Sequence, residues 1–267
     1  MAGNPDPLCF VHVREPLDPS GGHVPAVLIH GWASGSVYWE PLTALLLDTG
    51  RPVWTVDLPG YHPSQELPAG FEWTLDSAAA SVAAAIEARG GGRVHLVGHS
   101  MGGSVSLTLA ASRPELVATV ALVGMVPAPP NPGFRRMLES QAEQGFFDAG
   151  TIARCMDAWY GELSAGDKEL LSTGFDTPFP VLAASAKAAM TGVEPSVPGR
   201  VHAPLLVIAG TGDRVRSLGQ MEAFVAAAPG RRLHAIADAG HSVHWERPGE
   251  CAATLNEFWR TSWQPPA

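Results

Sequence analysis

The sequence has few cysteines, few basic residues and no long hydrophobic run, and each shortage excludes a class of protein. Its 267 residues include three cysteines, Cys9, Cys155 and Cys251, which are odd in number and widely spaced. This pattern fits neither a disulfide framework nor a CxxC metal or redox motif. We therefore expect three reduced side chains and no bound metal.

Basic residues are scarce, because 17 Lys and Arg stand against 26 Asp and Glu, for a net charge of −9. A surface that neutralises phosphates needs the opposite balance, so we expect no nucleic-acid partner. The longest apolar run, residues 117–126, is too short to span a bilayer, and residues 1–13 lack the basic start and long apolar stretch of a signal peptide. We expect a soluble, cytoplasmic protein with no membrane partner.

Short apolar runs alternate with amphipathic or alanine-rich stretches along most of the chain. This alternation is typical of an α/β protein with a mostly parallel sheet flanked by helices. Several runs are apolar on successive residues, as expected for strands buried on both faces. The predicted strands are 8–13, 24–30, 52–58, 93–98, 117–124, 204–210 and 231–237, and the predicted helices are 38–49, 74–89, 104–113, 217–228 and 249–263.

One interval breaks the alternation. It contains helical stretches and no candidate strand, and it is bordered by "VPAPPNPG" and "VEPSVPGR". Proline-rich borders of this kind are typical of the joints of an inserted segment. We expect residues 127–200 to form a helical cap, or lid, inserted into a core made of residues 1–126 and 201–267.

The motif "GHSMG", residues 98–102, places a serine directly between a buried-type strand and a helix. Such a sharp turn strains the backbone, and a Cβ two residues before or after the serine would collide with neighbouring backbone. Gly98 and Gly102 remove those atoms, and Gly103 lets the helix pack close to the sheet. The turn exposes the hydroxyl of Ser100 at the carboxyl edge of the sheet. The alternative is a phosphate-binding loop, but G-x-G-x-x-G and a P-loop lysine are both missing, and we expect no cofactor.

A serine hydroxyl alone is a poor nucleophile, so this interpretation requires a histidine base and an acid. His241 lies beyond the last predicted strand, directly after a glycine turn, and His244 is the close competitor. The favoured acid is Asp213, which follows the strand before it, and Asp238 is the nearest rival. Asp213 could also be a helix cap, but the order Ser100, Asp213, His241 places all three on loops at one edge of the sheet.

An oxyanion formed on the substrate needs N–H donors. The candidates are the backbone N–H groups of Met101, the residue after the serine, and of Trp32, in the turn after an apolar strand. Aromatic side chains of the predicted cap could line a pocket above the serine, or they could form the small core of the cap itself. The candidate pocket residues are Trp32, Phe134, Phe146, Trp159 and His244.

Taken in order, "HGW", "DLPGYHPS", "GHSMGG", "GTGD" and "GHSVHWERP" resemble the α/β-hydrolase superfamily, particularly its compact bacterial serine esterase-like members. The resemblance implies an eight-stranded sheet, so we expect a further short strand near residues 14–17, paired as a hairpin. It also implies roles: Ser100 as nucleophile, His241 as base, Asp213 as orienting acid, and Trp32 and Met101 as oxyanion donors.

One position departs from the family pattern D-x-x-G-x-G-x-S, because His62 stands where the second glycine would be. This difference bears on the shape of a loop more than on the chemistry. At the elbow, related epoxide hydrolases and haloalkane dehalogenases use an aspartate, whereas Ser100 implies acyl transfer through a serine ester.

The expected activity is that of a serine carboxylesterase or thioesterase acting on a small to medium apolar substrate. Alternative reactions that the same three residues could catalyse are C–C bond hydrolysis, cofactor-free perhydrolysis and acyl-transfer cyclisation. A further alternative is a ligand receptor without catalytic activity. Arg135, Arg136 and Arg154 could meet a carboxylate or an acidic carrier protein, or could form a solvated face. The expected partner is a small ester or thioester, and a carrier-bound acyl group is an open alternative.

Overall fold

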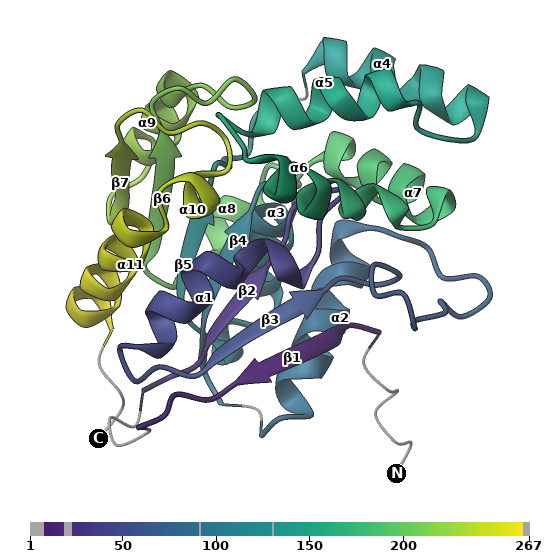
Figure 1. Ribbon diagram of the computed structural model, residues 1–267. Helices are drawn as coiled ribbons and strands as arrows, with labels where there is room; N and C mark the ends of the chain where they lie inside the picture. Colours follow the sequence, from purple (N-terminus) through teal and green to yellow (C-terminus); the bar gives the residue numbers. More distant parts are fainter. Residues whose placement is uncertain (1–7, 19–22, 91, 130, 264–267) are drawn as a thin grey trace.

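A central sheet with helices on both faces forms the larger part of the computed structural model, which describes residues 8–18, 23–90, 92–129 and 131–263 (Figure 1). The strand order is β1-β3-β2-β4-β5-β6-β7. Strand β1 runs antiparallel to β3, and the other neighbours are parallel. The predicted α/β class with a mostly parallel sheet is confirmed.

All seven predicted strands form, with every end within two residues of the expected one. Successive residues of the central strands are buried on opposite faces; Leu96, for example, packs in one apolar cluster and Val97 in the other. The unbroken apolar runs therefore reflect burial on both faces. The strands are β1 (Phe10–Arg14), β2 (Ala26–Ile29), β3 (Val53–Asp57), β4 (Val94–His99), β5 (Val117–Val123), β6 (Leu205–Gly210) and β7 (Arg231–Ile236).

The prediction of an eighth strand near residues 14–17 is wrong. Strand β1 ends at Arg14, and residues 15–17 are not in a strand. Pro16 has no N–H to donate to a ladder, and Leu17 is fully exposed, at 107%. In the described part of the chain, the sheet therefore has seven strands, with β1 at one edge.

The helices predicted between the strands form as well. Helices α2 and α3 contribute to the apolar cluster on one face of the sheet, and α1 and α11 to the cluster on the other. The elements outside the interval 127–200 are η1 (Ser36–Trp39), α1 (Glu40–Leu47), α2 (Leu75–Glu87), α3 (Met101–Ser112), η2 (Pro114–Leu116), α9 (Leu218–Ala226), α10 (Val243–Glu246) and α11 (Pro248–Ser262). No described helix has both the length and the apolar character that crossing a membrane requires.

The described part of residues 127–200 contains helices joined by loops and no strand. We refer to these residues as the helical segment. Local caps start two of them: the side chain of Asn131 accepts the N–H of Gly133 at 2.8 Å, and that of Asp148 accepts the N–H of Thr151 at 2.9 Å. The elements are α4 (Pro132–Gln144), α5 (Ala149–Trp159), α6 (Ala165–Ser172), η3 (Thr173–Asp176), α7 (Phe179–Thr191) and α8 (Val197–Arg200).

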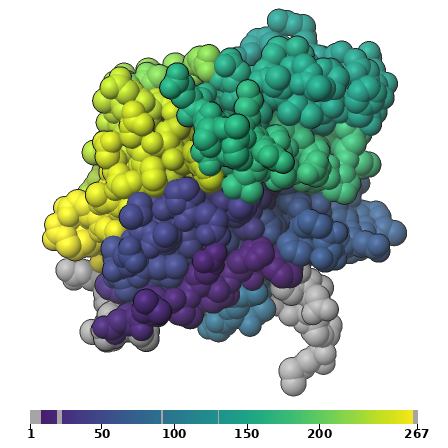
Figure 2. All heavy atoms as spheres, in the orientation of Figure 1, coloured from purple at the N-terminus to yellow at the C-terminus, as the bar shows by residue number. Residues whose placement is uncertain are grey.

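Helices α4 to α7 lie together above the end of the sheet to which the parallel strands point (Figure 1). In the space-filling view, the teal helical segment abuts the yellow C-terminal part of the chain (Figure 2). A hydrogen bond of 3.1 Å from the N–H of Ser242 to the carbonyl oxygen of Trp159 crosses this boundary. The helical segment thus stands over the carboxyl edge of the sheet.

Candidate active site

Ser100 occupies a strained turn between β4 and α3, with φ of 50° and ψ of −117°. A Cβ added at Gly98 would come closer than 3.0 Å to the carbonyl oxygen of Gly102, and one added at Gly102 equally close to that of Ile29. Real Cβ atoms essentially never make such contacts with backbone, so both positions require glycine. A Cβ at Gly103 would be 3.1 Å from the carbonyl oxygen of Gly98, which makes the packing tight there as well.

His241 and Asp213 form a buried pair at the same edge of the sheet. The imidazole Nδ1 lies 2.9 Å from the carboxylate Oδ2, and the two side chains are 3% and 0% exposed. The other oxygen, Oδ1, accepts the backbone N–H groups of Val215 at 2.7 Å and of Arg216 at 2.9 Å. A carboxylate accepts only, so Nδ1 donates to it and Nε2 keeps its lone pair for a proton.

The two rivals, Asp238 and His244, lie outside this pair. Asp238 is exposed, and its carbonyl oxygen accepts a hydrogen bond from Arg247 at 3.1 Å. His244 is fully buried, with its ring 4.3 Å from that of Tyr38 and 4.2 Å from that of Trp39, between centroids. Burial lowers the pKa of His244 well below its usual value, so the ring is neutral.

Two residues that sequence analysis missed hold the loop of His241 in place. The carboxylate of Glu246 accepts the N–H of Gly240 at 2.9 Å and that of Ser242 at 3.3 Å, one on each side of His241. His99 lies with its Nε2 3.2 Å from the carbonyl oxygen of His241. Both residues belong to the quoted motifs "GHSVHWERP" and "GHSMGG", which was the available signal.

The two candidate oxyanion donors follow strands β4 and β2. The N–H of Met101 begins helix α3, where the first amides have no acceptor within the helix. In the β2 turn, the N–H of Leu58 donates to Nε2 of His30 at 3.1 Å, so Nδ1 donates to the carbonyl oxygen of Gly31 at 2.7 Å. Because the described peptide bonds are trans, this hydrogen bond directs the N–H of Trp32 away from His30.

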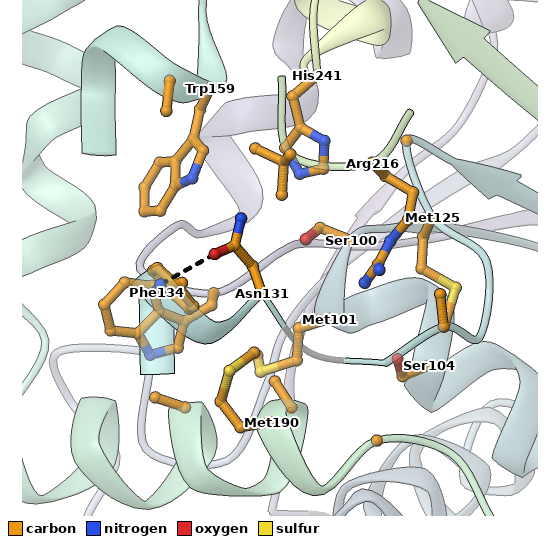
Figure 3. A pocket seen from close by; sticks show the side chains of 18 of the residues that line it. Ser100, Met101, Ser104, Met125, Asn131, Phe134, Trp159, Met190, Arg216 and His241 are labelled. Atoms are coloured by element: carbon orange, nitrogen blue, oxygen red, sulfur yellow. Dashed lines mark hydrogen bonds between the residues drawn. The ribbon is translucent and has the colours of Figure 1, made fainter. Parts of the chain in front are cut away.

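A cavity of about 990 Å³ lies beside Ser100 and His241, between the sheet edge and the helical segment (Figure 3). Of the predicted pocket residues, Trp32, Phe134 and Trp159 line it. Sequence analysis missed other lining residues, among them Met125, Asn131, Met190 and Arg216, because a helix or loop of unknown placement gives no signal of which side chains face inward.

The other two predicted pocket residues need correction, because neither lines the cavity. Phe146 is 55% exposed, since Gly145 ends α4 with φ of 79° and the chain turns outward there. His244 is fully buried, and its ring packs against those of Tyr38 and Trp39. Neither the aromatic character of Phe146 nor the position of His244 in a motif indicated the direction of the side chain.

The indole of Trp32 joins the sheet to the helical segment. Its Nε1 donates to the carbonyl oxygen of Leu182 at 2.8 Å. Four rings of the helical segment stand edge-on to it at centroid distances of 5.3 to 5.8 Å: Phe134, Phe147, Trp159 and Phe175. Of these, Phe134 and Trp159 line the cavity, whereas Phe147 and Phe175 do not.

In the described part of the chain, one group of side chains could hold a metal ion. It consists of His12, Asp57 and His62, whose ligand atoms lie within 4.8 Å of one another. The carboxylate of Asp57 already accepts the N–H of Ser36 at 2.6 Å and bonds the His12 ring at 2.8 Å. His62 stacks on Phe10 at a centroid distance of 3.9 Å. These side chains do not line the cavity of Ser100.

A family model described as "Alpha/beta hydrolase family" matches residues 26–254. The dihydrolipoyllysine-residue acetyltransferase component of the acetoin cleaving system of Cupriavidus necator is 31% identical over 89% of this chain, and the match spans 64% of that protein. The pimeloyl-[acyl-carrier protein] methyl ester esterase of Methylococcus capsulatus is 29% identical over 91% of this chain and 97% of its own.

Among solved structures, a thermophilic esterase from Thermogutta terrifontis superposes with a TM-score of 0.82. The two sequences are 22% identical, and the superposition covers 96% of this chain and 94% of the other. At this identity the likeness concerns the arrangement of the backbone.

Proposed function

The chain belongs to the alpha/beta hydrolase family, and on that premise we propose that it is a serine hydrolase that cleaves a carboxylic ester or thioester through an acyl-enzyme on Ser100. One observation carries the proposal: the buried pair of His241 and Asp213, 2.9 Å apart, stands at the cavity that Ser100 lines. A nucleophile, a base and an acid that orients the base are the groups that acyl transfer requires.

In the proposed reaction, the hydroxyl oxygen of Ser100 attacks the carbonyl carbon and gives its proton to Nε2 of His241. The negative oxygen that forms accepts hydrogen bonds from the N–H groups of Trp32 and Met101. When the carbon–oxygen or carbon–sulfur bond to the leaving group breaks, His241 returns the proton to the alcohol or thiol. Water then repeats the sequence and releases the acid, while Asp213 holds the imidazole and stabilises its cation.

The helical segment, residues 127–200, acts in this proposal as a cap over the core formed by residues 1–126 and 201–267. Support comes from side chains of α4, α5 and α7, such as Phe134, Trp159 and Met190, which line the cavity. A volume of about 990 Å³ fits a small to medium substrate. The likeness to a relative named as an esterase of an acyl-carrier-protein ester supports carrier-bound esters as a further substrate form.

The test is a series of p-nitrophenyl esters of increasing acyl length, given to the wild type and to Ser100→Ala. We expect turnover by the wild type and a loss of at least about 10³-fold in the variant. Labelling of Ser100 by a fluorophosphonate without ester turnover would move the proposal to C–C cleavage or acyl transfer on the same residues. If neither turnover nor labelling occurs, the serine hydrolase proposal is wrong, and the ligand receptor alternative gains.

A further inference from the structure

The cavity beside Ser100 differs in charge from the protein as a whole. The chain has 26 acidic and 17 basic residues. Of the described residues that line the cavity, none is Asp or Glu, and four are arginines, namely Arg154, Arg214, Arg216 and Arg231. Although the protein is acidic, the described lining of this cavity contains arginines and no carboxylate side chains. The resulting local positive field attracts an anion.

Three of these arginines are exposed or already engaged. Arg154 and Arg214 are exposed, and Arg214 pairs with Asp157, with 3.5 Å between Nη1 and Oδ2. Arg231 donates to the carbonyl oxygen of Phe224 at 2.8 Å and packs over its ring. The remaining cation, Arg216, is the one that needs an explanation.

Arg216 is half-buried and has few partners. Among the described residues, its guanidinium has one hydrogen bond, a long one of 3.4 Å from Nη1 to the carbonyl oxygen of Pro129, and forms no salt bridge. A guanidinium has five N–H donors and stays charged in proteins. Burial lowers the pKa of Arg216, and the nearby charge of Asp213 raises it. A desolvated cation with unused donors fits a carboxylate, which binds two of them at once.

Arg216 lines the same cavity as the proposed nucleophile, Ser100. Arg216 follows Asp213 by three residues in the loop after β6 and extends into the same cavity as Ser100 and Ser104 (Figure 3). Ser104 lies one turn along α3 from Ser100, which is about 6 Å. An anion at Arg216 and an ester at Ser100 would therefore occupy the same cavity.

On the basis of the proposed serine hydrolase function, we infer that the substrate carries a free carboxylate, a short chain away from the ester, and that Arg216 binds it. Of the four described guanidinium groups at the cavity, only that of Arg216 is neither exposed nor closely hydrogen-bonded. One such cation among many apolar lining residues suits a monoanion such as a carboxylate. The arginine thus selects an acidic ester over a neutral ester of the same length.

A second role for Arg216 has to be distinguished from this one. Its charge could serve only to stabilise the Asp213 carboxylate, and then its loss would slow every substrate equally. A role in binding the substrate predicts instead a loss confined to substrates that carry the carboxylate. The ratio of two activities separates the two roles.

The test compares p-nitrophenyl hydrogen adipate and suberate with p-nitrophenyl hexanoate and octanoate, after subtraction of spontaneous hydrolysis. In the wild type we expect a higher kcat/KM for the acidic esters. In Arg216→Met, the ratio of acidic to neutral kcat/KM should fall about tenfold to hundredfold, mainly through KM, and Arg216→Lys should restore part of it. As a matched control, Arg260→Met removes an exposed arginine of α11 and should leave the ratio unchanged.

Two outcomes would overturn the inference and leave the proposed function intact: neutral esters preferred by the wild type, or an equal loss on both substrate classes in Arg216→Met. If the wild type hydrolyses neither class and a fluorophosphonate does not label Ser100, the proposed function itself is wrong and this inference with it.

Discussion

The sheet edge that holds Ser100 and the helical segment above it differ in how tightly their residues are constrained. Helix α3, which begins at Met101, buries ten of its 12 residues, whereas helix α4 buries one of 13, Gln141. The residues proposed to react belong to the tightly packed region, and much of the lining of the cavity belongs to the loosely packed one. Substrate choice can therefore change without disturbing the elbow or the His241–Asp213 pair.

The largest effect should come from replacing Asp213 with Asn. Since Oδ1 of Asp213 accepts two backbone N–H groups, the amide oxygen of Asn takes that place and its NH₂ faces Nδ1 of His241. The ring must then accept at Nδ1 and carry its proton on Nε2, where it no longer serves as a base. We expect kcat on a p-nitrophenyl ester to fall by about 10³- to 10⁴-fold.

Asp238→Asn is the matched control for this variant, because Asp238 is exposed and outside the pair. Its kcat should stay close to that of the wild type. Equal losses in the two variants would contradict the assignment of Asp213 as the orienting acid.

A glycine in each region gives the next largest contrast. Gly102→Ala forces a Cβ into the backbone of β2, so we expect a loss of about 3 kcal/mol or more in the free energy of unfolding. Gly145→Ala, at the end of α4, meets no atom within 4 Å and is strained only by its φ of 79°, so about 1 kcal/mol is expected. Urea unfolding of both variants measures the difference. Similar losses would show that the elbow is no more constrained than the helical segment.

Acid should destabilise the sheet region first, because all ten histidines lie outside residues 127–200. Burial lowers the pKa of His95, in β4, to about 3, against about 6.5 in the unfolded chain. Below about pH 6.5 the unfolded chain therefore binds a proton that the folded one does not, and stability falls by about 1.4 kcal/mol per pH unit. His95→Gln should lessen this slope in urea unfolding between pH 7 and 5; an unchanged slope would contradict the prediction.

The smallest contrast lies within the helical segment. Phe134 lines the cavity and packs on Trp32, so Phe134→Ala should lower kcat/KM for long-chain esters about tenfold. Phe146 is exposed and outside the cavity, so Phe146→Ala should change kcat/KM less than about twofold. Equal effects of the two variants would place the substrate elsewhere than in this cavity.

The same contrast explains what was predictable from the sequence. Gly98 and Gly102 were predictable because their constraint is steric and local. Asp213 and His241 were predictable because parallel strands bring the loops at their carboxyl ends to one edge. All seven strands were found because short apolar runs mark buried strands directly in the sequence. The extra strand came from the family resemblance and not from a pattern in residues 14–17.

The lining of the cavity was not predictable in the same way. Phe134 and Phe146 are both aromatic residues of the helical segment, and only the orientation of α4 and the turn at Gly145 decides which one faces the cavity. Likewise, nothing in the "GTGDRVRS" loop distinguishes the inward Arg216 from the exposed Arg214. Such orientations depend on tertiary packing.

The central claim is that an acyl group is transferred to Ser100, and intact-protein mass spectrometry during the first turnovers of a p-nitrophenyl ester tests it most directly. We expect a single adduct with the mass of the acyl group, located by peptide mapping on Ser100 and absent from Ser100→Ala. Turnover without an adduct in either rapid-quench or steady-state samples, together with undiminished activity of Ser100→Ala, would contradict the claim.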